Sequence, residues 1–182
     1  MSLNLFQRTV ASALVVLAPG RLEAQASKEY ETKANFISLL LGYITWPPRG
    51  HDPNAPTTLV VLGISPFERY LDQAVARIVG RRAVRVVKVR SLSTSLLAET
   101  DAIFICASET ERLEDIIRIC RTRPILLLGD SPDFCRQGVM VNLIIQEGKI
   151  RSEVNLQAAR QARIEIGSAF LAAVKPRIID AN

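Results

Sequence analysis

Short apolar runs alternate with amphipathic helical stretches along this 182-residue chain, and this alternation restricts its fold more than any other feature. Four runs have the length of strands, at 58–64, 83–89, 102–106 and 125–128. Continuous apolar runs are typical of parallel strands that helices cover on both faces. We therefore expect an α/β fold, a three-layer sandwich with a mostly parallel sheet.

A C-terminal antiparallel hairpin is expected to join this sheet. The runs at 139–146 and 149–154 flank Glu147-Gly148, a pair of residues that suits a tight turn between two strands. No repeat and no linker-like stretch divides the rest of the chain. The residues that follow the N-terminal segment, 27–182, are therefore expected to form one domain.

The segments between the predicted strands carry sequence patterns that are typical of helices. An apolar stripe with spacings of three and four predicts a helix over 29–46, which Pro47-Pro48 would end. Ser65 and Ser108 are predicted to cap the helices that follow them. Asn155 is predicted to cap a last helix that continues to about residue 173 and kinks or splits at Gly167-Ser168.

The first 26 residues have the pattern of a signal peptide. Arg8 precedes an uncharged run at 9–18, and Ala24-Gln25-Ala26 fits the small-x-small rule, so we expect cleavage after Ala26 and export to the periplasm. The run is too short to cross a bilayer, and no transmembrane span is expected after cleavage. The alternative is an amphipathic or disordered N-terminus of a cytosolic protein.

The composition weighs against several classes of function. The one histidine, His51, lies in a proline-rich loop, and the chain has no nucleotide-binding glycine motif and no GxSxG nucleophile motif. The three cysteines form no CxxC pair, so we expect no metal site. Because the nucleotide-binding and nucleophile motifs are also absent from the sequence, we expect no cofactor and no catalytic residues. The net charge is +5, but the basic stretch at 77–90 has no aromatic residue for base stacking, which disfavours nucleic acid.

Two strand ends define a candidate ligand cleft. Gly63 and Gly129 each follow an apolar strand, and ligands of open α/β sheets bind beside such ends. Gly63, Ser65, Gly129 and Asp130 are therefore candidates to line a small-molecule cleft. The alternative for Asp130 is a structural role in the turn that precedes the next helix.

The cysteines allow one disulfide. Cys106 and Cys135 follow neighbouring parallel strands and would lie at the same edge of the sheet, whereas a straight helix would carry Cys120 about 18 Å from that edge. A bridge between Cys106 and Cys135 could form in an oxidising compartment. The other reading is three buried free thiols that pack as small hydrophobic groups.

Several blocks of the sequence resemble the YfiR-like family, and they keep their order from about residue 28 to 174. The blocks are Lys33-Ala34-Asn35-Phe36 through Trp46-Pro47, Leu62-Gly63 with Pro66-Phe67, Gly129-Asp130-Ser131-Pro132 with Phe134 and Gly138, Glu153-Val154-Asn155-Leu156 with Ala158-Ala159-Arg160, and Ile166-Gly167-Ser168. Each block alone is weak, but the combination is specific.

The resemblance implies a periplasmic regulator without catalysis. Such a protein would bind and repress the extracytoplasmic domain of a membrane signalling enzyme, foremost a diguanylate cyclase that makes cyclic di-GMP, and would form a homodimer. A sensor kinase is another conceivable partner. The resemblance assigns partner contacts to the C-terminal part of the chain, namely Glu153, Asn155, Arg160, Arg163, Ile166 and Phe170.

One departure from the family pattern concerns redox control. The resemblance implies a cysteine seven residues after Cys135, but this chain has Asn142 there, so that disulfide cannot form. Two alternative functions stay open from the residues alone. The first is a periplasmic sensor whose small ligand occupies the cleft, and the second, more distant, is a hydrolase.

Overall fold

The computed structural model describes residues 19–48, 55–67, 69–77 and 82–179. Nine strands occur in this part of the chain: β1 (Ile44–Thr45), β2 (Thr57–Leu62), β3 (Val84–Val89), β4 (Ala102–Ile105), β5 (Leu126–Gly129), β6 (Val141–Gln146), β7 (Lys149–Val154), β8 (Glu165–Ile166) and β9 (Arg177–Ile178). The helices are α1 (Pro19–Leu41), α2 (Tyr70–Ala76), α3 (Thr94–Glu99), the 3₁₀ helix η1 (Ala107–Arg112), α4 (Leu113–Cys120), α5 (Phe134–Gln137), α6 (Leu156–Gln161) and α7 (Ser168–Val174).

The main sheet has the strand order β3-β2-β4-β5-β6-β7-β9. The pairings from β3 to β6 are all parallel, and β6 and β7 form the antiparallel hairpin. At the turn of this hairpin, Glu147 and Gly148 both have positive φ, of 52° and 70°, which matches the twist of the two strands. The expected mostly parallel α/β sheet with its C-terminal hairpin is confirmed.

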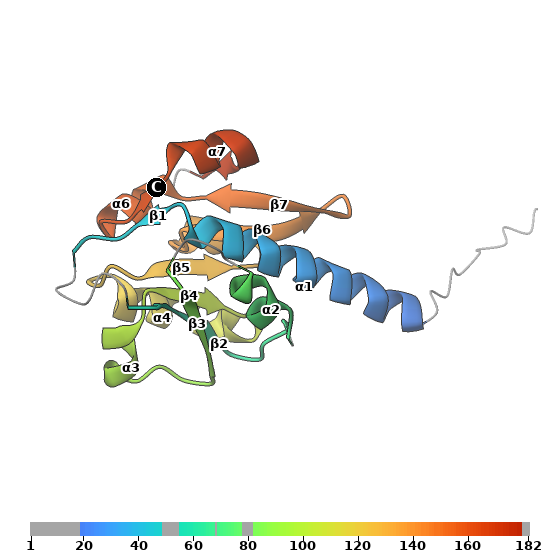
Figure 1. The fold of residues 1–182 in the computed structure, drawn as a ribbon, viewed down its shortest axis with the longest axis horizontal. Helices are drawn as coiled ribbons and strands as arrows, with labels where there is room; N and C mark the ends of the chain where they lie inside the picture. Colours follow the sequence, from blue (N-terminus) through green and yellow to red (C-terminus); the bar gives the residue numbers. More distant parts are fainter. Residues whose placement is uncertain (1–18, 49–54, 68, 78–81, 180–182) are drawn as a thin grey trace, which may run out of the picture.

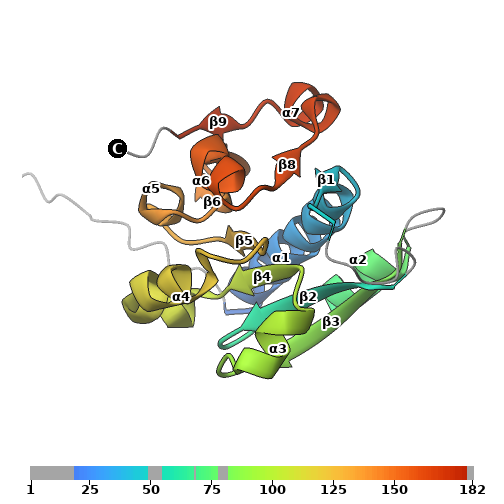
Figure 2. The same ribbon diagram turned by 90° about the vertical axis from the view of Figure 1, so that its left-hand side faces the viewer.

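Helices cover both faces of this sheet. Figure 2 shows α1 and α2 on one side and α3, α4 and α5 on the other. The ring of Phe170 in α7 lies 5.4 Å from the ring of Phe36, so α7 packs beside α1. β2, β4 and β5 are buried along their whole length, as continuous apolar runs between two helical layers require.

The first helix differs from the prediction at both ends. It begins at Pro19, a residue that suits the first turn, and crosses the predicted cleavage site after Ala26. It ends at Leu41 rather than at Trp46, because Ile44 and Thr45 pair with Ile166 and Glu165 to form a separate two-stranded antiparallel sheet. A local apolar period cannot reveal this pairing, since β8 lies more than a hundred residues away.

The predicted caps and bounds of the later helices are only partly confirmed. Asn155 caps α6 as predicted, and its Oδ1 accepts a hydrogen bond from the Ala158 N–H at 2.8 Å. The predicted long last helix is split, but the break begins after Gln161 and includes β8 before α7. The expected caps at Ser65 and Ser108 are wrong, because α2 and η1 begin after Arg69 and Cys106, and neither has a side-chain cap.

Most of the predicted signal peptide, and His51, lie outside the described residues, so cleavage after Ala26 stays a prediction. Within the described ranges, no helix has both the length and the apolar character that a transmembrane span requires.

Candidate functional site

The predicted ligand cleft lies at the carboxyl edge of the parallel strands. β2 has a parallel neighbour on each side, β3 and β4, which makes this edge the place where open α/β sheets usually bind ligands. Gly63 follows β2 with φ of 101°. A Cβ at Gly63 would lie 2.4 Å from Ser108 Oγ, which also accepts a hydrogen bond from the Ile64 N–H at 2.9 Å. The start of η1 therefore packs directly against the end of β2.

A buried ion pair lies at the end of β5. Lys33 Nζ of α1 is 2.9 Å from Asp130 Oδ2, and the side chains are 2% and 3% exposed. The hydroxyl of Tyr30 donates to the same oxygen at 3.1 Å, and Lys33 also contacts Glu29 at 2.5 Å. Burial, together with the Asp130 carboxylate, raises the pKa of Tyr30. These contacts stabilise two charges that burial alone would penalise.

Aromatic packing joins this pair to the core. Phe67 is fully buried, and its ring lies 5.4 Å from the ring of Tyr30 and 4.7 Å from the ring of Phe104, both edge to face. β4 separates the end of β2 from the end of β5. Asp130 therefore serves an internal ion pair with Lys33 and a hydrogen bond from Tyr30, and β4 lies between its strand and the strand that Gly63 follows.

A second buried polar cluster continues toward the hairpin. Asn142 and Glu153 are direct partners across β6 and β7, and Asn142 Nδ2 donates to Glu153 Oε2 at 3.2 Å and to the Ser131 carbonyl at 2.8 Å. Glu153 Oε1 lies 3.6 Å from Arg177 of β9. This cluster holds the loop after β5 and the strands β6, β7 and β9 in one arrangement.

The three cysteines are free and buried, so the possible bridge between Cys106 and Cys135 is not present and the free-thiol reading holds. Burial raises the pKa of Cys106 and of Cys135 to about 12 and that of Cys120 to about 11. Protonated thiols are poor nucleophiles, so these groups act as small core side chains.

The predicted partner residues do not form one surface. Glu153, Asn155, Ile166 and Phe170 are buried within the chain, at 7%, 1%, 6% and 1% exposure. The first two serve the polar contacts at the hairpin, Ile166 pairs with β1, and Phe170 packs against Phe36 and Tyr43. Arg160 and Arg163 remain exposed, so only these two residues of the predicted set are accessible to a partner.

Lys33 and Asn142 were missed as members of a buried polar network. Lys33 lies on the same helical stripe as Tyr30, Ala34 and Ile37, and a lysine within an apolar stripe is the signal that could have found it. Asn142 within an apolar strand is the corresponding signal on the sheet. Across the residues that the structure describes, no three acidic, histidine or cysteine side chains gather as a metal site would require.

Two solved structures have a similar fold. One is the ABC domain from Streptococcus pneumonia in complex with L-Trp, with a TM-score of 0.57 and 13% identity over 80% of this chain and 60% of that one. The other is a conserved domain protein from Vibrio cholerae O1 biovar El Tor strain N16961, also with a TM-score of 0.57, with 16% identity over 81% and 60%. At these identities the likeness concerns the fold alone, and this chain spans less than two thirds of either protein.

No curated protein matches the sequence. The family model described as YfiR/HmsC-like matches residues 30–173, which is most of the chain and includes Lys33 with Asp130 and Asn142 with Glu153. At the level of the family, this match supports periplasmic regulation of diguanylate cyclase signalling. The chain belongs to the YfiR/HmsC-like family.

Proposed function

We propose that this protein is a periplasmic repressor that binds the extracytoplasmic domain of a membrane-bound diguanylate cyclase and thereby lowers the synthesis of cyclic di-GMP. The family match over residues 30–173 is the observation that carries this proposal. The signal-peptide pattern at 1–26 agrees with it. The repressor would act by covering its partner, and its active form would be a homodimer.

The face of the sheet that carries α1 offers apolar surface for such a complex. Leu39 of α1 is 49% exposed, and Ile145 and Ile178 are 47% and 46% exposed. Ile145 of β6 pairs with Ile150 of β7, and Ile178 of β9 pairs with Val154 of β7. Ile150 and Val154 are four residues apart on the same strand and point to the same face, so Ile145 and Ile178 also share one face of the sheet.

The strand register identifies that face. Leu127 of β5 lines a cavity together with residues of α4 and α6, so its neighbour Leu128 points to the opposite face, where α1 lies. Leu128 pairs with Val141, and Val141 pairs with Val154. Ile145 and Ile178 therefore lie on the face of the sheet that α1 covers, and we assign the partner surface to this face.

The proposal is tested with the chain that starts at residue 27, immobilised and exposed to solubilised inner membranes. We expect a membrane diguanylate cyclase to be retained, and the free protein to reduce cyclic di-GMP synthesis by that cyclase. Leu39→Glu and Ile145→Glu should each weaken binding about tenfold or more, since central apolar contacts dominate such interfaces. Ile119→Glu is the matched control, because Ile119 is 45% exposed but lies on α4, on the other face.

Retention of no cyclase, or equal weakening by Ile119→Glu, would contradict the proposed partner or the proposed surface. The homodimer is tested separately by sedimentation. A chain that stays monomeric at micromolar concentration while it still inhibits the cyclase would refute the dimeric form alone.

A further inference from the structure

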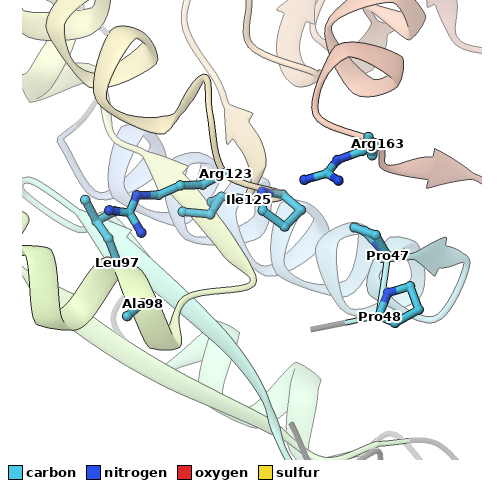
Figure 3. Close-up of a pocket in the computed structure, with 8 residues that line it drawn as sticks. Pro47, Pro48, Leu97, Ala98, Arg123, Ile125 and Arg163 are labelled. Carbon is cyan, nitrogen blue, oxygen red and sulfur yellow. The ribbon is translucent and has the colours of Figure 1, made fainter. Parts of the chain in front are cut away.

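A cavity of about 270 Å³ opens at the edge of the sheet opposite the buried ion pair. It lies where β5 begins, next to the C-terminal half of α3, and its walls are Pro47, Pro48, Leu97, Ala98, Arg123, Pro124, Ile125 and Arg163. Figure 3 shows Arg163 reaching into the cavity from the side of Pro47, whereas the guanidinium of Arg123 points toward Leu97 on the other side. The volume suits a small molecule near the lower end of the usual range for ligand sites.

The two arginines are the only charged residues of this lining, and both are positive. In the described part of the chain, neither guanidinium makes an ion pair or a side-chain hydrogen bond. Nearby carboxylates are engaged elsewhere: Asp101 accepts from the Thr58 N–H at 2.8 Å, and Glu99 pairs with Arg85 at 3.1 Å. Two like charges that share a partly apolar cavity attract an anion and are stabilised by it.

The backbone at Arg163 is the second, independent observation. α6 ends in a Schellman motif, in which the Ile164 N–H donates to the Ala159 carbonyl and the Arg163 N–H donates to the Arg160 carbonyl, both at 2.9 Å. Arg163 has φ of 59° at the position of this motif where glycine is usual. An arginine there costs stability that glycine would not, and such strain is common at functional sites.

We propose that this cavity binds a small organic anion whose carboxylate or phosphate group pairs with the guanidinium of Arg163, while Arg123 adds a second positive charge to the cavity wall. The apolar part of the ligand would lie against Leu97 and Ile125, which are 5% and 1% exposed and give the cavity an apolar wall. Guanidinium groups suit this task because they offer paired N–H donors to a carboxylate or a phosphate. The site is independent of the repressor function proposed above, and it differs in place and residues from the cleft predicted at the other edge.

The test titrates the chain from residue 27 with four probes at constant ionic strength: inorganic phosphate, phenyl phosphate, benzoate and uncharged benzyl alcohol. Binding is followed by calorimetry and by the NMR signals of the arginine side chains. We expect saturable binding of phenyl phosphate and benzoate, at least about tenfold tighter than inorganic phosphate, and none of benzyl alcohol. Preference for phenyl phosphate over benzoate would identify a phosphate ligand, and the reverse would identify a carboxylate.

Two variants separate binding from folding. Arg163→Gly should remove anion binding and at the same time raise the melting temperature by about 2–4 °C, because glycine relieves the left-handed backbone. Lys175→Gly is the matched control, since Lys175 also ends a helix with positive φ, of 49°, but lies outside the cavity. It should raise the melting temperature similarly and leave anion binding unchanged.

Arg123→Gln should weaken binding about tenfold or more without the gain in stability. Binding that both Arg163→Gly and Arg123→Gln retain would overturn the proposal, and so would the absence of saturable binding by any of the three anions. Loss of binding in Lys175→Gly to the same degree as in Arg163→Gly would also overturn it, because the effect would then reflect net charge alone.

Discussion

The ion pair between Lys33 and Asp130 should be among the most costly contacts of the molecule to break. Lys33→Met removes the cation and leaves the Asp130 carboxylate 3% exposed, with a hydrogen bond from the Tyr30 hydroxyl. Removal of one partner of a buried pair typically costs about 3–5 kcal/mol, because the other charge stays desolvated. A domain of this kind has a total stability of roughly 5–15 kcal/mol, so the variant should lose a large fraction of it.

A matched control comes from Lys88, which lies 2.8 Å from Asp72 in an exposed pair with side chains 40% and 51% accessible. The two pairs have the same chemistry and nearly the same distance, and they differ in burial. Lys88→Met should therefore cost only about 0–1 kcal/mol. The double variant Lys33→Met with Asp130→Leu should recover most of the loss, since it removes both buried charges.

Urea unfolding of the four proteins, followed by circular dichroism, measures these free energies. The reasoning predicts that Lys33→Met shifts the midpoint strongly, that Lys88→Met leaves it nearly in place, and that the double variant lies between them. If Lys33→Met and Lys88→Met are equally mild, burial does not govern the strength of these pairs. If the double variant is less stable than Lys33→Met, the loss comes from packing rather than from the unpaired charge.

Three further predictions concern the hairpin, the thiols and helix α6. Asn142→Cys should form a disulfide with Cys135 under oxidising conditions, because the backbone of Asn142 hydrogen-bonds to that thiol. The oxidised variant should be about 2 kcal/mol more stable to unfolding than its own reduced form. Intact mass and urea unfolding test this, and Cys135→Ser on the same background should abolish both effects. The pKa values of Cys106 and Cys135 rise from 9 to about 12 on folding, so the stability that their neutral forms provide is complete below pH 9 and is lost as the pH rises toward 12; unfolding midpoints that do not fall over this range would contradict it. Asn155→Ala removes the hydrogen bonds to the Ala158 N–H and to the Cys135 carbonyl, both at 2.8 Å, and should lower the stability of the fold by about 2–4 kcal/mol. Asn155→Asp should lower the stability less, because it keeps the helix cap. Thermal unfolding of both variants measures the difference.

Local patterns in the sequence were sufficient for much of the fold. The apolar runs predicted the parallel strands, because strands buried on both faces need apolar side chains at every position. Glu147-Gly148 predicted the hairpin turn and Asn155 the cap of α6, since both depend on the conformation and hydrogen bonds of a few neighbouring residues. The family could also be recognised, because its motifs are short and keep their order along the chain.

The candidate sites depended on contacts between distant segments, and these only the tertiary structure decided. The pairing of β1 with β8 shortened the first helix, and the position of α1 over the sheet joined Lys33 to Asp130. The burial of Glu153 and Phe170, and the cavity that collects Arg123 and Arg163, follow from the same packing. A side chain's own type and neighbours in sequence set its local preference, whereas its burial and its partners depend on which elements the whole fold brings beside it.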